Sequence, residues 1–161
     1  TVILSKDKIT KNDYFKANEI WKVDGGWELT VHSAEYVDYY NSFHKPDPKK
    51  IVLVRYSYKN LGTEGFSGAG LYFVPSQKVE AIGKKGIVAD TYPLSIPYDK
   101  TYLHNDATIP VHIKVGESLE NAYSGISLSD EAESIRLNFE HIDAKGNTHS
   151  ADFVVPIDKK K

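Results

Sequence analysis

The chain has 161 residues, of which 40% are hydrophobic and 26% are charged, and this is the composition of one folded globular domain rather than of a disordered segment. Its 20 basic and 22 acidic side chains leave a formal charge of −2, and only two of the bases are Arg, so the chain lacks the positive charge that nucleic-acid-binding proteins carry. Cysteine is absent, which excludes disulfides, thiolate catalysis and cysteine-ligated metal sites.

The N-terminal residues differ from the rest of the chain. Residues 1–20 are polar and rich in Lys after the short apolar run Val2–Leu4, and they show neither strand nor helix periodicity. We predict that they form a tether or a loosely docked arm, and that residues 21–161 form a single domain. Because the chain starts at Thr1 and contains no Met, we expect it to be a processed or truncated product.

Two strands can be predicted in the first half of the domain. After a turn at Gly25–Gly26, apolar and polar side chains alternate over Trp27–His32, as in a half-buried strand. The segment Ile51–Asn60 is rich in β-branched and aromatic residues, which predicts a central strand covered on both faces for much of its length. A glycine-rich segment follows, and Leu71–Val74 is predicted to form another short strand before Pro75.

The second half of the domain begins with an irregular stretch. Residues 78–106 are interrupted by Gly and Pro, and no element is assigned to them. Alternation returns in Ile109–Val115, where every second side chain is apolar, and this pattern predicts a strand with one buried face. Tyr123–Leu128 is predicted to form a further short strand.

The C-terminal hairpin can be predicted residue by residue. Asp143–Gly146 suits a type I turn with glycine at the left-handed position, and this turn pairs Asp143 with Asn147. Counting outward gives a register in which the apolar pairs share one face and the polar pairs share the other. The apolar pairs are Phe139–Ala151, Leu137–Phe153 and Ile135–Val155, and the polar pairs are Glu140–Ser150 and Asn138–Asp152.

No segment combines a helical period with helix caps, and strands recur at the spacing of a sandwich. We therefore predict an all-β fold, an antiparallel β-sandwich of about seven to nine strands, with a barrel as the alternative.

Four segments together resemble a known kind of domain: Trp27–Glu35, Ile51–Gly62, Val115–Leu119 and Ile135–Phe139. They are similar to the immunoglobulin-like domains of unknown function found in lipoproteins and secreted antigens of Gram-positive bacteria. In that pattern a long strand ends in a turn of Asn and a small residue, and a later turn with Lys or Gly precedes two closing strands. The resemblance implies an immunoglobulin-like sandwich at the cell surface, exported and either secreted or held at the membrane by an N-terminal anchor outside this chain. It implies no catalytic residues.

Catalytic and metal-binding motifs are incomplete in this sequence. The segment Gly65–Gly70 contains a Ser but breaks the frame of a nucleophile elbow, and we predict that the protein is not an enzyme and needs no cofactor. The six His show no metal-ligand spacing, although the hairpin register places His141 opposite His149. Glu117–Asp143 carries seven acidic residues and one basic residue but no calcium-loop pattern, so no metal site is predicted.

Aromatic side chains are concentrated before the turn at Pro46–Pro48. Five aromatic or imidazole groups fall within nine residues: Tyr36, Tyr39, Tyr40, Phe43 and His44. A strand sends about half of its side chains outward, so some of these rings are expected to be exposed on the end of the sandwich. Such rings suit protein or glycan contact, and we predict a partner-binding surface here; packing over the end of the sandwich is the alternative.

These observations predict a non-catalytic extracellular interaction or accessory domain of a bacterial cell-envelope lipoprotein or secreted protein. Its partner is expected to be another envelope protein, a host protein or a glycan, and not a nucleic acid. The alternative is a ligand- or metal-binding receptor module that uses His141 and His149 or the acidic stretch.

Overall fold

The computed structural model describes residues 14–37, 50–76, 78–83, 86–89, 91–94, 108–128, 132–143 and 145–158. These residues form an all-β fold without an α-helix, as predicted; the one helical turn among them is the 3-10 turn Phe66–Gly68. No helix in this part of the chain is long and apolar enough to cross a membrane.

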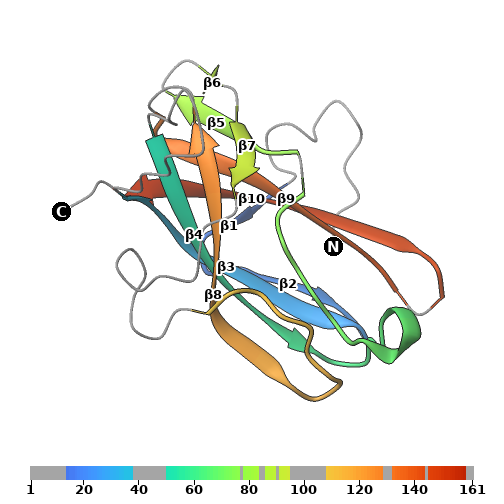
Figure 1. Ribbon diagram of the computed structural model, residues 1–161. Coiled ribbons are helices and arrows are strands. Elements are labelled where there is room, and N and C mark those ends of the chain that lie inside the picture. Colours follow the sequence, from blue (N-terminus) through green and yellow to red (C-terminus); the bar gives the residue numbers. More distant parts are fainter. Residues whose placement is uncertain are drawn as a thin grey trace.

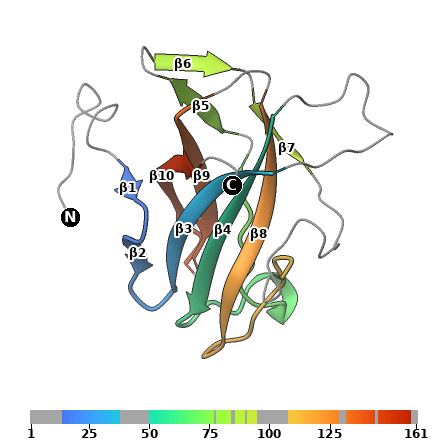
Figure 2. The ribbon, with the colours of Figure 1, turned by 90° about the vertical axis from the view of Figure 1, so that its left-hand side faces the viewer.

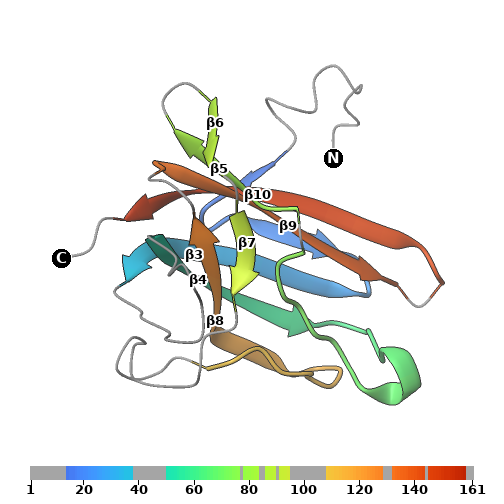
Figure 3. The ribbon, with the colours of Figure 1, turned by 45° about the horizontal axis from the view of Figure 1, so that its top comes forward.

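The strands form two layers (Figures 1, 2 and 3). The first layer contains β2 (Ile20–Val23), β3 (Trp27–Val37), β4 (Lys50–Asn60), β8 (Ser118–Leu128) and β7 (Thr91–Leu94). The second contains β1 (Phe15–Lys16), β10 (Thr148–Asp158), β9 (Ser134–Ile142), β5 (Glu80–Gly83) and β6 (Gly86–Ala89). Figure 2 shows β3, β4 and β8 side by side, with β9 and β10 behind them.

One corner joins the two layers, because the end of β10 pairs in parallel with β3 through Ile157 and Ala34. The resulting strand order is β6-β5-β9-β10-β3-β4-β8-β7, with β1 on β10 and β2 on β3. Among the described residues no pairing joins β6 to β7, so this sheet is open at both ends and the barrel alternative is wrong.

The predicted alternation in β3 is confirmed. Trp27, Leu29 and Val31 are completely buried between the layers. A β-bulge follows Val31 and shifts the register by one residue, so that Ala34 rather than Ser33 continues the buried face.

The central strand β4 is covered on both faces at its start. Val52 and Val54 belong to the core between the layers, and the residues that alternate with them, Ile51 and Leu53, are only 2% and 1% exposed. Because alternate residues point to opposite faces, the sheet has buried apolar side chains on its outer side here as well. This confirms the prediction for the first part of the strand.

The predicted C-terminal hairpin is confirmed in every pair. Leu137 lies opposite Phe153, Phe139 opposite Ala151, and the backbone N–H of Asp143 donates to the carbonyl of Asn147 at 2.9 Å. All six side chains of the three apolar pairs are buried. The turn chemistry and the apolar pattern therefore specify the same register.

Two predicted strands are wrong. Leu71–Val74 and Ile109–Val115 are joined to each other by a single bridge, Leu71↔Ile113, and do not form regular strands. Ile113 is 5% exposed, but the other members of its apolar stripe, Ile109, Val111 and Val115, are 47%, 41% and 49% exposed. Most of the predicted apolar face is therefore not buried.

The irregular stretch and the N-terminus contain more structure than the sequence indicated. Within residues 78–106, to which no element was assigned, lie the three four-residue strands β5, β6 and β7. At the N-terminus, Phe15 and Lys16 pair with β10, and the ring of Phe15 stacks on Phe153 at 5.2 Å. The folded domain thus includes the last part of the expected arm, while residues 1–13 lie outside the described residues.

Candidate functional site

Tyr36 is the one residue of the predicted aromatic surface that the structure describes. It is half-buried near the end of β3 and packs against the core. Its hydroxyl donates to the carbonyl of Ala132 at 2.8 Å and accepts the N–H of the same residue at 2.9 Å. Tyr36 therefore ties β3 to the segment that leads into β9. Tyr39, Tyr40, Phe43 and His44 lie outside the described residues.

The structure does define where that segment leaves the sandwich. Val37 and Ile51 are the last pair between β3 and β4, whereas Trp27 and Asn60 pair at the other end of the same two strands. The chain thus leaves β3 and re-enters β4 at the end remote from Trp27.

The predicted pair His141 and His149 is confirmed as a cross-strand pair. Both rings contact the ring of Trp27, at centroid distances of 5.1 and 5.6 Å. Burial lowers the pKa of His141 below its usual value. His149 Nε2 lies 2.7 Å from Asp143 Oδ2, and this hydrogen bond is the main reason why the pKa of Asp143 falls to about 2.

The part of the chain that the structure describes holds no cluster of three His, Asp or Glu side chains arranged to bind a metal ion. Asp130 and Glu131 of the acidic stretch lie outside that part. Asp143 also accepts the N–H groups of Lys145 and Asn147, at 2.8 and 2.9 Å. Its carboxylate therefore organises the hairpin turn.

Asn60, the last residue of β4, lies at the same end of the sandwich as Trp27. The side chain is completely buried, and both of its functional ends are hydrogen-bonded. Its Nδ2 donates to the carbonyls of Thr63 at 2.6 Å and Ile113 at 2.9 Å. Its Oδ1 accepts the N–H groups of Gly62 at 3.1 Å and Thr63 at 2.6 Å.

The backbone of Asn60 is held too. Its N–H donates to Glu117 and its carbonyl accepts from Gly116, at 2.9 and 2.8 Å. Leu61 N–H and Thr63 Oγ1 donate to the carbonyl of Gly26, at 2.9 and 3.0 Å. One buried amide thus joins the end of β4, the glycine-rich loop and the turn before β8, and the adjacent residues tie them to the β2–β3 turn. We call this arrangement the Asn60 junction.

A surface cavity of about 320 Å³ lies beside the Asn60 junction. It is lined by Thr63, Glu64, Gly68, Gly70, Lys114 and Val115. It therefore offers a carboxylate, an ammonium group, backbone polar groups and one apolar side chain. The Asn-Leu-Gly turn could be seen in the sequence, but the cavity could not, because its two walls are about fifty residues apart in the chain.

Searches with this chain found no matching protein-family model, no matching curated protein and no matching solved structure.

Proposed function

We propose that this chain is a non-catalytic interaction or accessory domain of immunoglobulin-like type, exported to the bacterial cell envelope as part of a lipoprotein or secreted protein. The observation that carries the proposal is the order of its strands. The resemblance of the four sequence segments described above supports the same kind of domain.

The strand order supports an immunoglobulin-like topology. In constant-type immunoglobulin domains the sheets have the orders A-B-E-D and C-F-G, and variable-type domains add a C′ strand beside C. Lettering the strands from β3 onward makes the first layer, β3-β4-β8-β7, A-B-E-D. The second layer, β6-β5-β9-β10, becomes C′-C-F-G.

The proposed interaction surface is the connection between β3 and β4. Its base is rigid, because Tyr36 is fastened to Ala132 through both a donated and an accepted hydrogen bond. Tyr39, Tyr40, Phe43 and His44 follow within eight residues of this anchor. Aromatic rings carried by a firmly held base bind a protein or glycan partner at a low entropic cost.

The experiment replaces Tyr39 and Tyr40 together with Ser and measures both thermal melting and binding to bacterial or host cells. We expect binding to be lost and the melting temperature to be retained. The matched control is Tyr14→Ser, which removes a Tyr from a different part of the chain and is expected to retain binding. A large loss of stability in the double variant would instead assign these rings to the core, and unchanged binding would place the partner elsewhere.

The compartment and the alternative function have separate tests. Cell fractionation of the source bacterium is expected to place the protein in the envelope or the medium, and a cytosolic pool alone would refute export. A receptor module that binds metal through His141 and His149 would melt at a higher temperature in the presence of zinc, because binding only to the folded state stabilises it. A zinc-dependent rise that His149→Ala abolishes would favour that alternative.

A further inference from the structure

The two segments that line the cavity beside the Asn60 junction also carry a pair of stacked rings. Leu71 and Ile113 form an antiparallel bridge, with N–H to carbonyl distances of 2.8 and 2.9 Å, and both side chains point into the core. Their neighbours therefore point to the outer side. On one side of the bridge these neighbours are Gly70 and Lys114, and on the other they are Tyr72 and His112.

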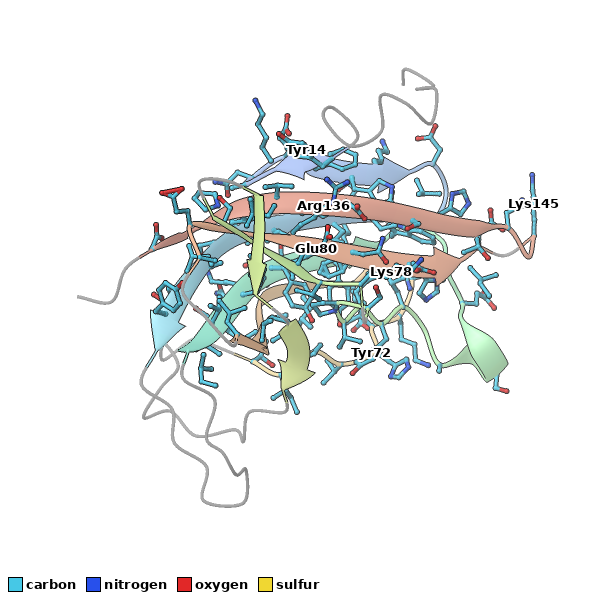
Figure 4. The ribbon with its side chains drawn as sticks, turned by 90° about the horizontal axis from the view of Figure 1, so that it is seen from above. Tyr14, Tyr72, Lys78, Glu80, Arg136 and Lys145 are labelled. Carbon is cyan, nitrogen blue, oxygen red and sulfur yellow. The ribbon has the colours of Figure 1, made fainter. Side chains whose placement is uncertain are left out.

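The rings of Tyr72 and His112 stack with their centroids 4.7 Å apart and an interplanar angle of 17°. Tyr72 is partly exposed and His112 is exposed, so the stacked pair, which we call the Tyr72–His112 platform, lies at the surface. Each ring covers one face of the other, so a ligand would stack on the outer face of one ring. Figure 4 shows Tyr72 on the opposite side of the molecule from Tyr14. Since Gly70 and Lys114 line the cavity, the platform lies two residues further along each segment from its wall.

Gly70 allows the two segments that carry the cavity wall to approach closely. Its φ is +100°, and a Cβ at this position would meet the carbonyl oxygen of Ile113 at 2.3 Å, so only glycine fits. The adjoining walls are fixed by hydrogen bonds. Gly70 N–H donates to the carbonyl of Glu64, and Lys114 Nζ donates to the carbonyl of Gly68, both at 2.7 Å.

The chemistry of this surface points to one class of ligand. An aromatic face binds an apolar surface, while the carboxylate of Glu64 accepts hydrogen bonds and the ammonium of Lys114 donates them. The two charges are opposite, so the site does not select a charged ligand. A pyranose sugar has an apolar C–H face and a rim of hydroxyls that both donate and accept. A volume of about 320 Å³ is at the lower end of small-molecule sites, which suits one or two sugar rings.

We propose that the cavity and the Tyr72–His112 platform form a binding site for a neutral carbohydrate. The sugar ring lies on the platform and its hydroxyls reach Glu64 and Lys114. This site is at the Trp27–Asn60 end of the sandwich and is separate from the surface proposed above, which begins at the Val37–Ile51 end.

The test is a titration of the isotope-labelled protein with cellobiose, maltose, lactose and N,N′-diacetylchitobiose, followed by NMR. We expect at least one of them to shift the signals of Tyr72, His112 and Lys114 saturably. Tyr72→Ala is expected to weaken this binding at least about tenfold, equivalent to about 1.4 kcal/mol. Gly68→Asn fills the cavity from a position where a Cβ meets no atom within 4 Å and where φ is +75°, a conformation that Asn tolerates, so it is expected to abolish binding without unfolding the domain.

Tyr14→Ala is the matched control, because Tyr14 lies on another face beside Arg136, and it is expected to leave the titration unchanged. The proposal is overturned if none of the four sugars shifts these signals. It is equally overturned if Tyr72→Ala and Gly68→Asn both remain folded by NMR and bind as the wild type does. The double variant with Tyr39→Ser and Tyr40→Ser is expected to retain sugar binding. Failure of the proposed partner surface between β3 and β4 can therefore be distinguished from failure of the carbohydrate site.

Discussion

Phe153 contacts two aromatic rings in addition to its cross-strand partner on the hairpin. It lies opposite Leu137, stacks on Phe15 at 5.2 Å and meets the edge of Phe139 at 5.9 Å. The side chain is completely buried. We expect Phe153→Ala to lower the free energy of unfolding by about 3 to 5 kcal/mol, because it leaves a cavity between the layers. Denaturant unfolding measures this.

The matched control for Phe153→Ala is Ile142→Ala on the same hairpin. Ile142 is 57% exposed, so its loss is expected to change stability by no more than about 0.5 kcal/mol. Equal effects of the two substitutions would contradict the register and the burial described for β9 and β10.

His141 makes the stability of the domain depend on pH. Burial lowers its pKa in the folded state below the usual value of 6.5, and the hydrogen bond with the carbonyl of Ile142 offsets part of this shift. The unfolded chain therefore takes up the proton first as the pH falls. The stabilising effect of neutral His141 is complete above pH 6.5 and is lost as the pH falls through the lower pKa of the folded state.

We expect the free energy of unfolding to be lower at about pH 5.5 than at about pH 7.5, and the difference to be smaller in His141→Gln. Denaturant titrations of both proteins at the two pH values measure it. His32, whose pKa is also lowered chiefly by burial, contributes in the same direction and remains in the variant. Parallel pH curves for the two proteins would show that His141 does not carry the effect.

At the scale of elements, the Asn60 junction determines how β4 ends. Asn60→Ala would remove the partner of the N–H and of the carbonyl of Thr63, which lie in the interior, whereas the Ile113 carbonyl keeps the N–H of Leu71 and the Gly62 N–H keeps the carbonyl of Gly26. We expect a loss of roughly 3 kcal/mol or more in the free energy of unfolding, since each buried polar group without a partner costs about 1 to 3 kcal/mol. Lys59→Ala, at the exposed neighbouring position, is the control and is expected to be nearly neutral. A neutral Asn60→Ala would show that the loop holds its shape without the amide.

Elements with two independent signals could be predicted from the sequence. In the C-terminal hairpin, the Asp143–Gly146 turn and the apolar pattern specify one register, and that register is confirmed. In Ile109–Val115 the only signal was the alternation of apolar and polar side chains. This alternation does not identify a pairing partner, and Thr108 and Ile113 each make only an isolated bridge. β5 and β6 have only four residues each, and one of the four is Gly83 or Gly86, so neither strand shows an alternating apolar pattern.

In the candidate sites too, the sequence predicts pairing within the hairpin but not contacts between distant segments. The His141–His149 pairing followed from the register, but the contact of both rings with Trp27 did not, because Trp27 lies on another strand more than a hundred residues away. The cavity has walls from the 63–70 loop and from residues 114–115, which only the three-dimensional fold brings together. The predicted surface from Tyr36 to His44 stays a prediction beyond Tyr36.

At the scale of the whole molecule, the short strand β1 covers part of the core at the start of the described chain. β1 has only two residues, but Phe15 covers Phe153 and its backbone extends the second layer. Relative to a chain that starts at Tyr14, a chain that starts at Ala17 is expected to lose about 2 kcal/mol, from the apolar area and the ring stacking of Phe15. Thermal and denaturant unfolding of the two chains test this. Equal stabilities would mean that the domain begins after β1.

The parallel pairing of β1 with β10, and of β10 with β3, also affects how the domain responds to mechanical force. The chain enters through β1 and leaves through the end of β10, and these strands point the same way. A pull on the two ends of the chain therefore slides β1 along β10, and the hydrogen bonds between them are loaded together instead of being opened one at a time. Strands joined in this way resist a force along their length more strongly than strands that can be peeled apart.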